Sequence, residues 1–316
     1  MIRILLGAIT AFSLTVCLLP IVIHFSKKLK LRQTILSYVD NHFSKSGTPT
    51  MGGIGFIVGI AVATLVLDVD KVTVVSVIVM IGYGVVGFLD DFIKIYFRRN
   101  EGLKPYQKIV FQLIIAVIVA ISAYYNSSEI SLVFASFDIG IFVIPLNIFL
   151  FLAFTNSVNL TDGLDGLAST VTLVSLAFFG AILGLPDIIV GGQASSLAVF
   201  CFAIVGAMIA FLLFNSYPAK IFMGDTGSLA LGGAFAAISV YSGQVVVAAV
   251  TGIMFVVSAL SVIIQVLHYK RTKKRIFLMA PFHHHLERKG LHENKIVSIY
   301  GAITFFVSAI LLAVVL

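Results

Sequence analysis

Apolar runs of roughly twenty residues alternate with short polar segments along the whole chain. A run of this length crosses the bilayer as a helix, because a helix satisfies its own backbone hydrogen bonds in lipid. The runs are continuous and not alternating, which excludes a transmembrane β-barrel. The pattern predicts an all-α, polytopic membrane protein of one domain, 1–316. Its ten spans lie roughly at 3–25, 52–67, 72–92, 107–125, 143–158, 166–184, 195–214, 228–242, 245–269 and 296–315.

Two local features refine this pattern. Between the fourth and fifth spans, residues 130–143 carry β-branched and aromatic residues around a turn-like Ser-Phe-Asp-Ile-Gly. This segment predicts a small outer hairpin, with an irregular cap on the helix ends as the alternative. The first run, 4–25, is too long for a signal-peptide core and lacks a small-residue cleavage site, so it is expected to be a mature span.

Composition agrees with a membrane solvent. The chain is 59% hydrophobic and 11% charged, with a mean hydropathy of +1.10, which excludes a water-soluble globule. Cys17 and Cys201 both fall inside apolar runs without paired spacing. They are interpreted as small buried apolar side chains that form neither a disulfide nor a metal site.

The cations give the orientation. All but two of the 21 Lys and Arg residues, Arg3 and Lys71, fall in segments on one side of the predicted membrane. The positive-inside rule makes that side cytoplasmic, and the even number of spans places both termini outside. A basic inner face follows from topology alone but would also suit an anionic substrate, so charge does not decide the function. No nucleic-acid partner is expected.

Four clusters of polar residues lie at the inner membrane edge, where charge is costly and usually functional. The first is Asp90-Asp91, at the end of the third span. Adjacent carboxylates repel each other and a helix C-terminus disfavours negative charge. A divalent cation or a shared proton would relieve the pair.

The second cluster repeats a polar residue at every third position, and its members are Asn156, Asn159, Asp162 and Asp165. Such spacing lines one side of a helical or 3₁₀ path. Gly163 would let the backbone approach a ligand closely. Capping of the sixth span explains Asp165 alone, but not the whole stripe.

The third cluster, residues 215–228, leads into the eighth span. Helix capping accounts for one of Asp225, Thr226 or Ser228. Phe222, three residues before Asp225, adds a ring that could stack on a base beside a metal carboxylate. The free amides of a helix N-terminus also form an anion site.

The fourth cluster is His283-His284-His285, in the longest inner loop. Consecutive histidines point in different directions, unlike the i, i+4 pair of a zinc helix. A phosphate partner or a proton shuttle is favoured over a structural zinc site. Carboxylates for a hard cation, basic groups for phosphate and a stacking ring on one face together indicate phosphoryl transfer.

Five separated motifs then support a resemblance. They are Ser46-Gly47-Thr48-Pro49-Thr50-Met51-Gly52-Gly53, Asp90-Asp91, Asn159-Leu160-Thr161-Asp162-Gly163-Leu164-Asp165-Gly166, Gly224-Asp225 and Pro281-Phe282-His283-His284-His285-Leu286-Glu287. With them the chain resembles, over essentially its whole length, the phospho-N-acetylmuramoyl-pentapeptide transferase (MraY) family. That family belongs to the polyprenyl-phosphate N-acetylhexosamine-1-phosphate transferases of glycosyltransferase family 4.

The resemblance implies residue roles. Asp90, Asp91, Asp225 and His284 are expected to be catalytic, with Asp225 and Asp91 holding Mg²⁺. Asn159, Asp162, Gly163, Leu164 and Phe222 match the uridine-binding region. The rest of the substrate cleft would include Lys45, Thr50, Lys94, Asp165, Asn215, Gln265, His283 and His285. The resemblance also implies a broken ninth span that leans into lipid, with which Gly252 is compatible.

The implied reaction joins UDP-N-acetylmuramoyl-pentapeptide to undecaprenyl phosphate, giving lipid I and UMP on the cytoplasmic face of a bacterial inner membrane. One alternative is a sister transferase that loads another aminosugar phosphate, which the histidine loop disfavours. The other is an ion-coupled transporter, whose sites usually lie nearer mid-membrane. The sequence leaves the oligomeric state open, with a homodimer among the options.

Overall fold

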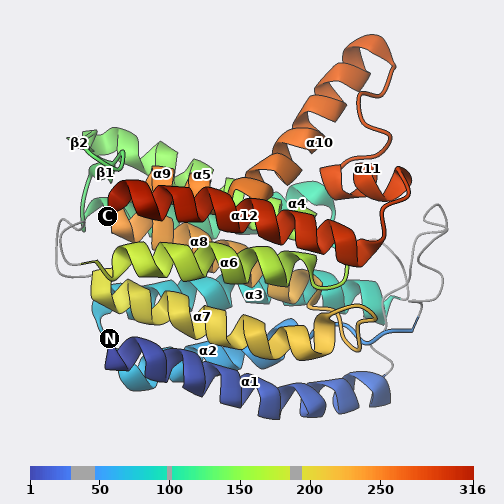
Figure 1. The fold of residues 1–316 in the computed structure, drawn as a ribbon, viewed down its shortest axis with the longest axis horizontal. Coiled ribbons are helices and arrows are strands. Elements are labelled where there is room, and N and C mark those ends of the chain that lie inside the picture. The colour runs from blue at the N-terminus through green and yellow to red at the C-terminus, as the bar shows by residue number, and fades with distance from the viewer. Residues whose placement is uncertain (30–46, 98–101, 186–193) are drawn as a thin grey trace.

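The computed structural model describes residues 1–29, 47–97, 102–185 and 194–316, and they form a helical bundle with one small sheet (Figure 1). The helices are α1 (Ile2–Lys28), α2 (Gly53–Leu67), α3 (Lys71–Tyr96), α4 (Pro105–Tyr124), α5 (Val143–Thr161), α6 (Leu167–Leu183), α7 (Ala194–Asn215), α8 (Gly224–Ser242), α9 (Val245–Thr251), α10 (Ile253–Thr272), α11 (Phe282–Arg288) and α12 (Glu293–Val315). The strands are β1 (Glu129–Ser131) and β2 (Ser136–Asp138), and a short 3₁₀ turn, η2 (Gly140–Phe142), precedes α5.

The prediction of an all-helical membrane protein is confirmed at this level. Within the described residues, seven helices are long and apolar enough to cross a membrane: α1, α3, α4, α5 with its preceding turn, α7, α10 and α12. The helices α2 and α6 are apolar but shorter. Cys201 is buried as expected, whereas Cys17 is exposed on α1, so the expectation of burial was wrong for Cys17. The count of ten spans stays a prediction, as does the choice of membrane side for the termini.

The ninth apolar run does not form one continuous helix. It is divided at Gly252, which ends α9 and begins α10 with φ −88° and ψ 22°. After this break α10 points away from the bundle (Figure 1). A single span over 245–269 was therefore wrong, and the break that the resemblance implied is present.

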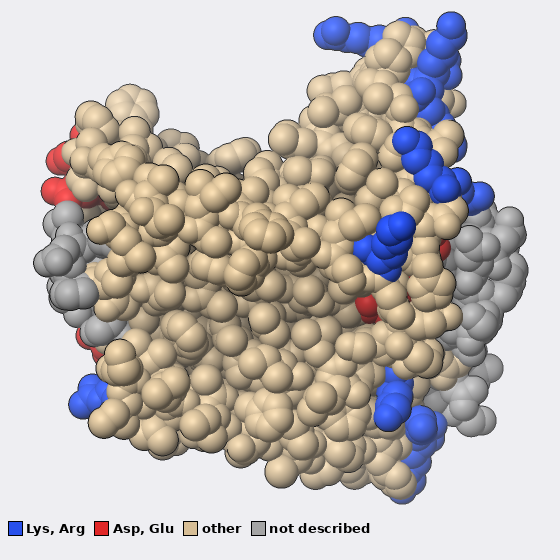
Figure 2. All heavy atoms as spheres, viewed as in Figure 1, with Lys and Arg blue, Asp and Glu red and all other residues tan. Residues whose placement is uncertain are grey.

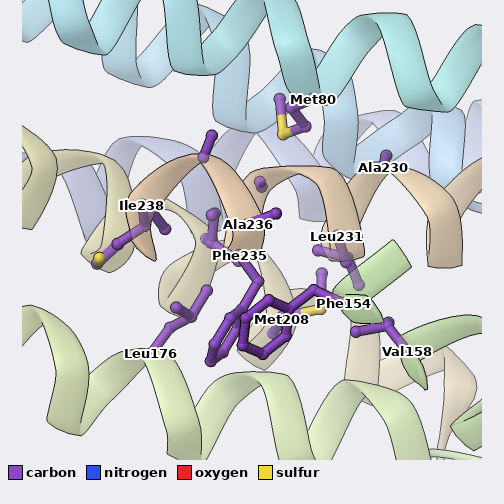
Figure 3. Close-up of a cluster of buried hydrophobic side chains, with 14 of the residues drawn as sticks. Met80, Phe154, Val158, Leu176, Met208, Ala230, Leu231, Phe235, Ala236 and Ile238 are labelled. Carbon is purple, nitrogen blue, oxygen red and sulfur yellow. The ribbon is translucent and has the colours of Figure 1, made fainter. Parts of the chain in front are cut away.

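The centre of the bundle is α8, whose residues from Thr226 to Ser239 are all buried. Small residues permit this burial, because helices approach closely where no bulky side chain separates them. A Cβ added at Gly232 would lie 2.5 Å from the backbone of Thr155 on α5. Figure 3 shows the larger side chains that fill the remaining space, with Phe154 and Phe235 close together. Their ring centroids are 4.7 Å apart.

The two ends of the bundle differ in charge. Both termini lie at the end that carries the sheet, and α11 lies at the opposite end (Figure 1). Figure 2 shows most of the visible Lys and Arg gathered toward the α11 end, whereas visible Asp and Glu appear at both ends. The strands pair antiparallel, with Ile130 opposite Phe137, so the predicted small sheet is present. Its placement outside the membrane stays a prediction.

This charge asymmetry predicts the membrane orientation. In a background lacking Cys17 and Cys201, we expect cysteines introduced at Lys104 and Arg288 to react with an impermeant maleimide only after the cells are opened. A cysteine at Glu129 should react in intact cells, because it lies at the opposite end. Labelling of position 288 in intact cells would contradict this orientation.

Candidate active site

Three aspartates meet where α3 ends and α8 begins. Asp90 and Asp91 come from the last turns of α3 and are 3% and 5% exposed. Asp225 lies in the first turn of α8. One carboxylate oxygen from each residue lies within 4.8 Å of the others. The sequence placed these residues on one face, and the structure brings them into a single cluster.

The carboxylate of Asp91 is bound by the N-terminus of α8. It accepts hydrogen bonds from the backbone N–H of Asp225 at 3.2 Å, and from the backbone N–H and hydroxyl of Thr226 at 2.9 and 2.7 Å. The first N–H groups of a helix have no partner within the helix and carry partial positive charge. Asp91 satisfies two of them and thereby fastens α3 to α8.

Two glycines make this contact sterically possible. A Cβ on Gly87 would overlap the backbone carbonyl of Asp225, so α3 and α8 touch there without an intervening side chain. Gly224 has φ +71°, a left-handed conformation that favours glycine. A Cβ at this position would lie 2.5 Å from Asp91 Oδ2 and 2.9 Å from Thr50 Oγ1. The Gly-Asp motif thus needs its glycine beside the carboxylates.

Two lysines and one amide hold both oxygens of Asp225 and one oxygen of Asp90. Lys94 Nζ lies 2.6 Å from Asp90 Oδ2 and 2.8 Å from Asp225 Oδ2. Lys108 Nζ, from α4, lies 3.0 Å from the same Asp225 oxygen. Asn159, from α5, donates to Asp225 Oδ1 at 2.7 Å. Side chains from α3, α4 and α5 therefore converge on the carboxylate of α8.

Asp162 lies just past the end of α5, and the charges of the acid cluster affect the pKa of its carboxyl group. Burial, followed by the nearby carboxylates with Asp225 first among them, raises the pKa of Asp162 well above its usual range. A cation bound among these carboxylates would lower that pKa, because it would stabilise the ionised form.

The three aspartates fit a divalent cation. Carboxylate oxygens are the preferred ligands of hard cations such as Mg²⁺, which usually keeps several waters and takes few protein ligands. Like charges this close are costly without a positive partner. The cluster of Asp90, Asp91 and Asp225 could therefore hold a divalent ion.

The segment that precedes α2 positions the loop that precedes α8. Phe222 donates its backbone N–H to Pro49 at 2.9 Å and accepts from Gly52 at 2.9 Å, while Met223 accepts from Gly53 at 3.1 Å. The Gly-Thr-Pro-Thr-Met-Gly-Gly motif therefore acts as a backbone partner for the 222–223 segment. Phe222 itself is half-buried, three residues before Asp225.

The histidine loop reaches the second polar cluster. His283 is fully buried, and its Nε2 packs against the Cα of Gly163. His284 Nδ1 lies 2.9 Å from Glu287. His285 accepts a hydrogen bond from the backbone of Leu278 at 3.1 Å and stacks on Phe282, with ring centroids 5.7 Å apart.

The side chains of three predicted substrate residues form hydrogen bonds to the protein backbone. Asn215 accepts from the backbone of Gly166 at 3.1 Å and donates to Ile221 at 2.9 Å. Asp165 accepts from the backbone of Ala219 at 3.0 Å. The side chain of Gln265 is bonded to the backbone of residues 276 and 277. Their substrate roles stay predictions.

Two further predicted substrate residues are Leu164 and Lys45. Leu164 is buried, at 4% exposure. Lys45 lies outside the described residues, so its predicted role stays untested.

Sequence reasoning missed Lys108. It follows Lys104 by one helical turn among many inner cations, and nothing in its local sequence distinguishes it. It also missed that Asn156 donates to Gln112 at 2.8 Å. Gln112 is four residues after Lys108 on α4, and Asn156 is three residues before Asn159 on α5. The polar stripe thus continues from the acid cluster into the α4–α5 interface.

Comparison with known proteins places these residues in a family. The model of glycosyl transferase family 4 matches residues 72–243, which include all three clustered aspartates. The chain is 45% identical to the phospho-N-acetylmuramoyl-pentapeptide-transferase of Clostridioides difficile (strain 630), over 94% of this chain and 93% of that protein. It is 42% identical to the proteins of the same name in Clostridium novyi (strain NT) and Desulfitobacterium hafniense (strain DSM 10664 / DCB-2). Those matches cover 94% of this chain and 92% and 93% of the relatives.

The acid cluster predicts a loss of metal binding in Asp225→Asn. We expect this variant to bind Mn²⁺, measured by electron paramagnetic resonance in detergent, about 10-fold or more weakly than the wild type, because a hard cation requires carboxylate charge. Asp138→Asn, at the sheet end, is the matched control and should bind normally. Equal affinity in the two variants would remove Asp225 from the metal site.

The contact between α3 and α8 predicts a second difference. Gly87→Ala should lower both the thermal stability and Mn²⁺ affinity, because its methyl group would meet the backbone of Asp225 and separate Asp91 from α8. Gly82→Ala lies on the same helix, where an added Cβ makes only an ordinary contact at 3.6 Å. This control should stay close to wild type, and equal behaviour of the two variants would contradict the steric argument.

Proposed function

The chain belongs to glycosyl transferase family 4, and we propose from this premise that it transfers phospho-N-acetylmuramoyl-pentapeptide from UDP-N-acetylmuramoyl-pentapeptide to undecaprenyl phosphate. The products are lipid I and UMP. The observation that carries the proposal is the acid and lysine cluster at one end of the bundle, in a chain similar over nearly its full length to transferases of that name.

The diphosphate of the nucleotide sugar is the group that this cluster suits. Lys94 and Lys108 place two ammonium groups beside Asp225, within reach of phosphate oxygens at the same position. Asp225 and Asp91 would hold Mg²⁺, and Asp225 is the less buried of the two. When bound, Mg²⁺ neutralises the charge on diphosphate oxygens.

The nucleoside would lie between the second and third polar clusters. Half-buried Phe222 would stack on uracil, and Asp162, Gly163 and Leu164 would supply the other contacts to the nucleoside. Asn159 connects the two regions, since its amide donates to both Asp225 and Ser228. These contacts would fix the distance between the base and the diphosphate.

The lipid phosphate is the attacking group. Its oxygen forms a bond to the phosphorus of the sugar phosphate, and UMP leaves with the electrons of the broken P–O bond. A phosphate monoester has a second pKa near ~6, so it is mostly dianionic at neutral pH and needs no strong base. Asp90 would orient the lipid phosphate or accept a residual proton, and His284 with Glu287 would act as a proton shuttle.

The reaction would take place at the cytoplasmic face of a bacterial inner membrane. The acid cluster lies near α11, because Asn159 donates to Asp225 and His283 packs against Gly163, four residues after Asn159. Most of the visible cations lie toward the α11 end, which is the expected inner end (Figures 1 and 2). A homodimer stays a prediction. The transporter alternative is weakened by the same placement, because transport sites usually lie near mid-membrane.

The deciding experiment measures UMP release from UDP-N-acetylmuramoyl-pentapeptide by purified protein, with and without undecaprenyl phosphate. Release that requires both the lipid and Mg²⁺ is the expected result. UDP-N-acetylglucosamine serves as the competing donor. Faster release from that donor would indicate the sister transferase, and no release from either would reject the proposal.

Stacking predicts the effect of Phe222→Ala. Base stacking contributes about 1–3 kcal/mol, so the affinity for UMP should fall about 5- to 150-fold. Phe306→Ala, on the exposed side of α12, is the control and should leave UMP affinity unchanged. Equal affinities, measured by isothermal titration calorimetry in detergent, would make Phe222 a packing residue.

A further inference from the structure

One carboxylate oxygen of the acid cluster is bonded to two lysine ammonium groups. Asp225 Oδ2 accepts hydrogen bonds from Lys94 Nζ at 2.8 Å and from Lys108 Nζ at 3.0 Å. We propose that these lysines compete with the divalent cation for Asp225 Oδ2, so that the metal and the diphosphate bind cooperatively. This inference rests on the proposed function and adds to it a role for Lys108.

The competition follows from geometry and charge. A Mg²⁺ ion binds a carboxylate oxygen at about 2.0–2.1 Å. An ammonium group within hydrogen-bond distance of the same oxygen would then repel the metal. Two such groups occupy the space around Asp225 Oδ2, so metal binding at this oxygen requires that they move.

The lysines are the partners that can move. The other bonds of the cluster come mainly from fixed donors: the backbone N–H groups of Asp225 and Thr226 hold Asp91, and that of Leu103 holds Asp90 at 2.9 Å. The short amide of Asn159 holds Asp225 Oδ1 from within α5. A lysine ammonium, by contrast, sits on a flexible four-carbon stem.

A displaced ammonium group needs a new anionic partner. The side chain of Lys108 is only 16% exposed, so leaving its charge unpaired would be costly. The diphosphate of the substrate supplies that partner at the same place. The metal alone should therefore bind weakly, and bound diphosphate should increase the affinity for the metal. By linkage, the metal strengthens diphosphate binding by the same factor.

Lys108→Gln tests the competition without the reaction. We expect this variant to bind Mn²⁺ alone about 10-fold more tightly than the wild type, the scale of one charge-assisted hydrogen bond, by electron paramagnetic resonance in detergent. Lys104→Gln is the matched control, one turn earlier on α4. Its ammonium lies exposed and bonds none of the three clustered aspartates in the described part of the chain, so wild-type affinity is expected. Lys108→Gln affinity equal to or weaker than that of Lys104→Gln would overturn the proposal.

A second measurement tests the cooperativity. UDP should increase the Mn²⁺ affinity of the wild type and of Lys104→Gln by a larger factor than that of Lys108→Gln. Equal factors in all three proteins would overturn the proposal. If Lys108→Gln does not elute as a folded protein on size exclusion, Lys94→Gln replaces it with the same expectations.

The same preparations separate this inference from the proposed function. Wild-type protein that releases no UMP rejects the transferase assignment. The Mn²⁺ titration without nucleotide still decides the competition in that case.

Discussion

Repulsion among three carboxylates, placed at the edge of an apolar bundle, is the constraint that organises the site. Asp90, Asp91 and Asp225 lie within 4.8 Å of one another, which costs free energy unless positive charge offsets it. The helix N-terminus of α8 and the ammonium groups of two lysines supply that charge. The three sources come from separate segments, so the site requires those segments to meet at one point.

The packing of α8 allows that meeting. A helix whose first turn must touch α3 cannot carry a side chain at the point of contact, and Gly87 meets this need from the α3 side. Further along α8, Gly232 permits the backbone of α5 to approach as closely. Small residues on α3 and α8 therefore serve the chemistry at the end of α8, because they let α3 and α5 approach α8 closely.

The sequence predicted which residues are polar without a structural reason, but not how each one is used. The adjacent pair Asp90-Asp91 and the Gly-Asp motif were recognisable because charge at a membrane edge is rare. Lys108 was not, since its pairing with Asp225 joins residues 117 positions apart and depends on how α4 packs. The resemblance assigned the amides of Asn215 and Gln265 to the substrate cleft, and those roles stay predictions. In the structure both amides bond backbone, because loops also need partners for their N–H and C=O groups.

The helix that follows the break at Gly252, α10, contacts the loop that carries the histidines. Beyond it, α10 leaves the bundle, yet Ser261 on α10 accepts the backbone N–H of Phe282 at 3.0 Å. Gln265, one turn later, binds the backbone of residue 277 in the same loop. His283 in turn packs against Gly163, beside the polar stripe. The direction in which α10 leaves the bundle therefore helps to set where the histidines meet the polar stripe, so this apolar helix and the histidine loop form one structural unit.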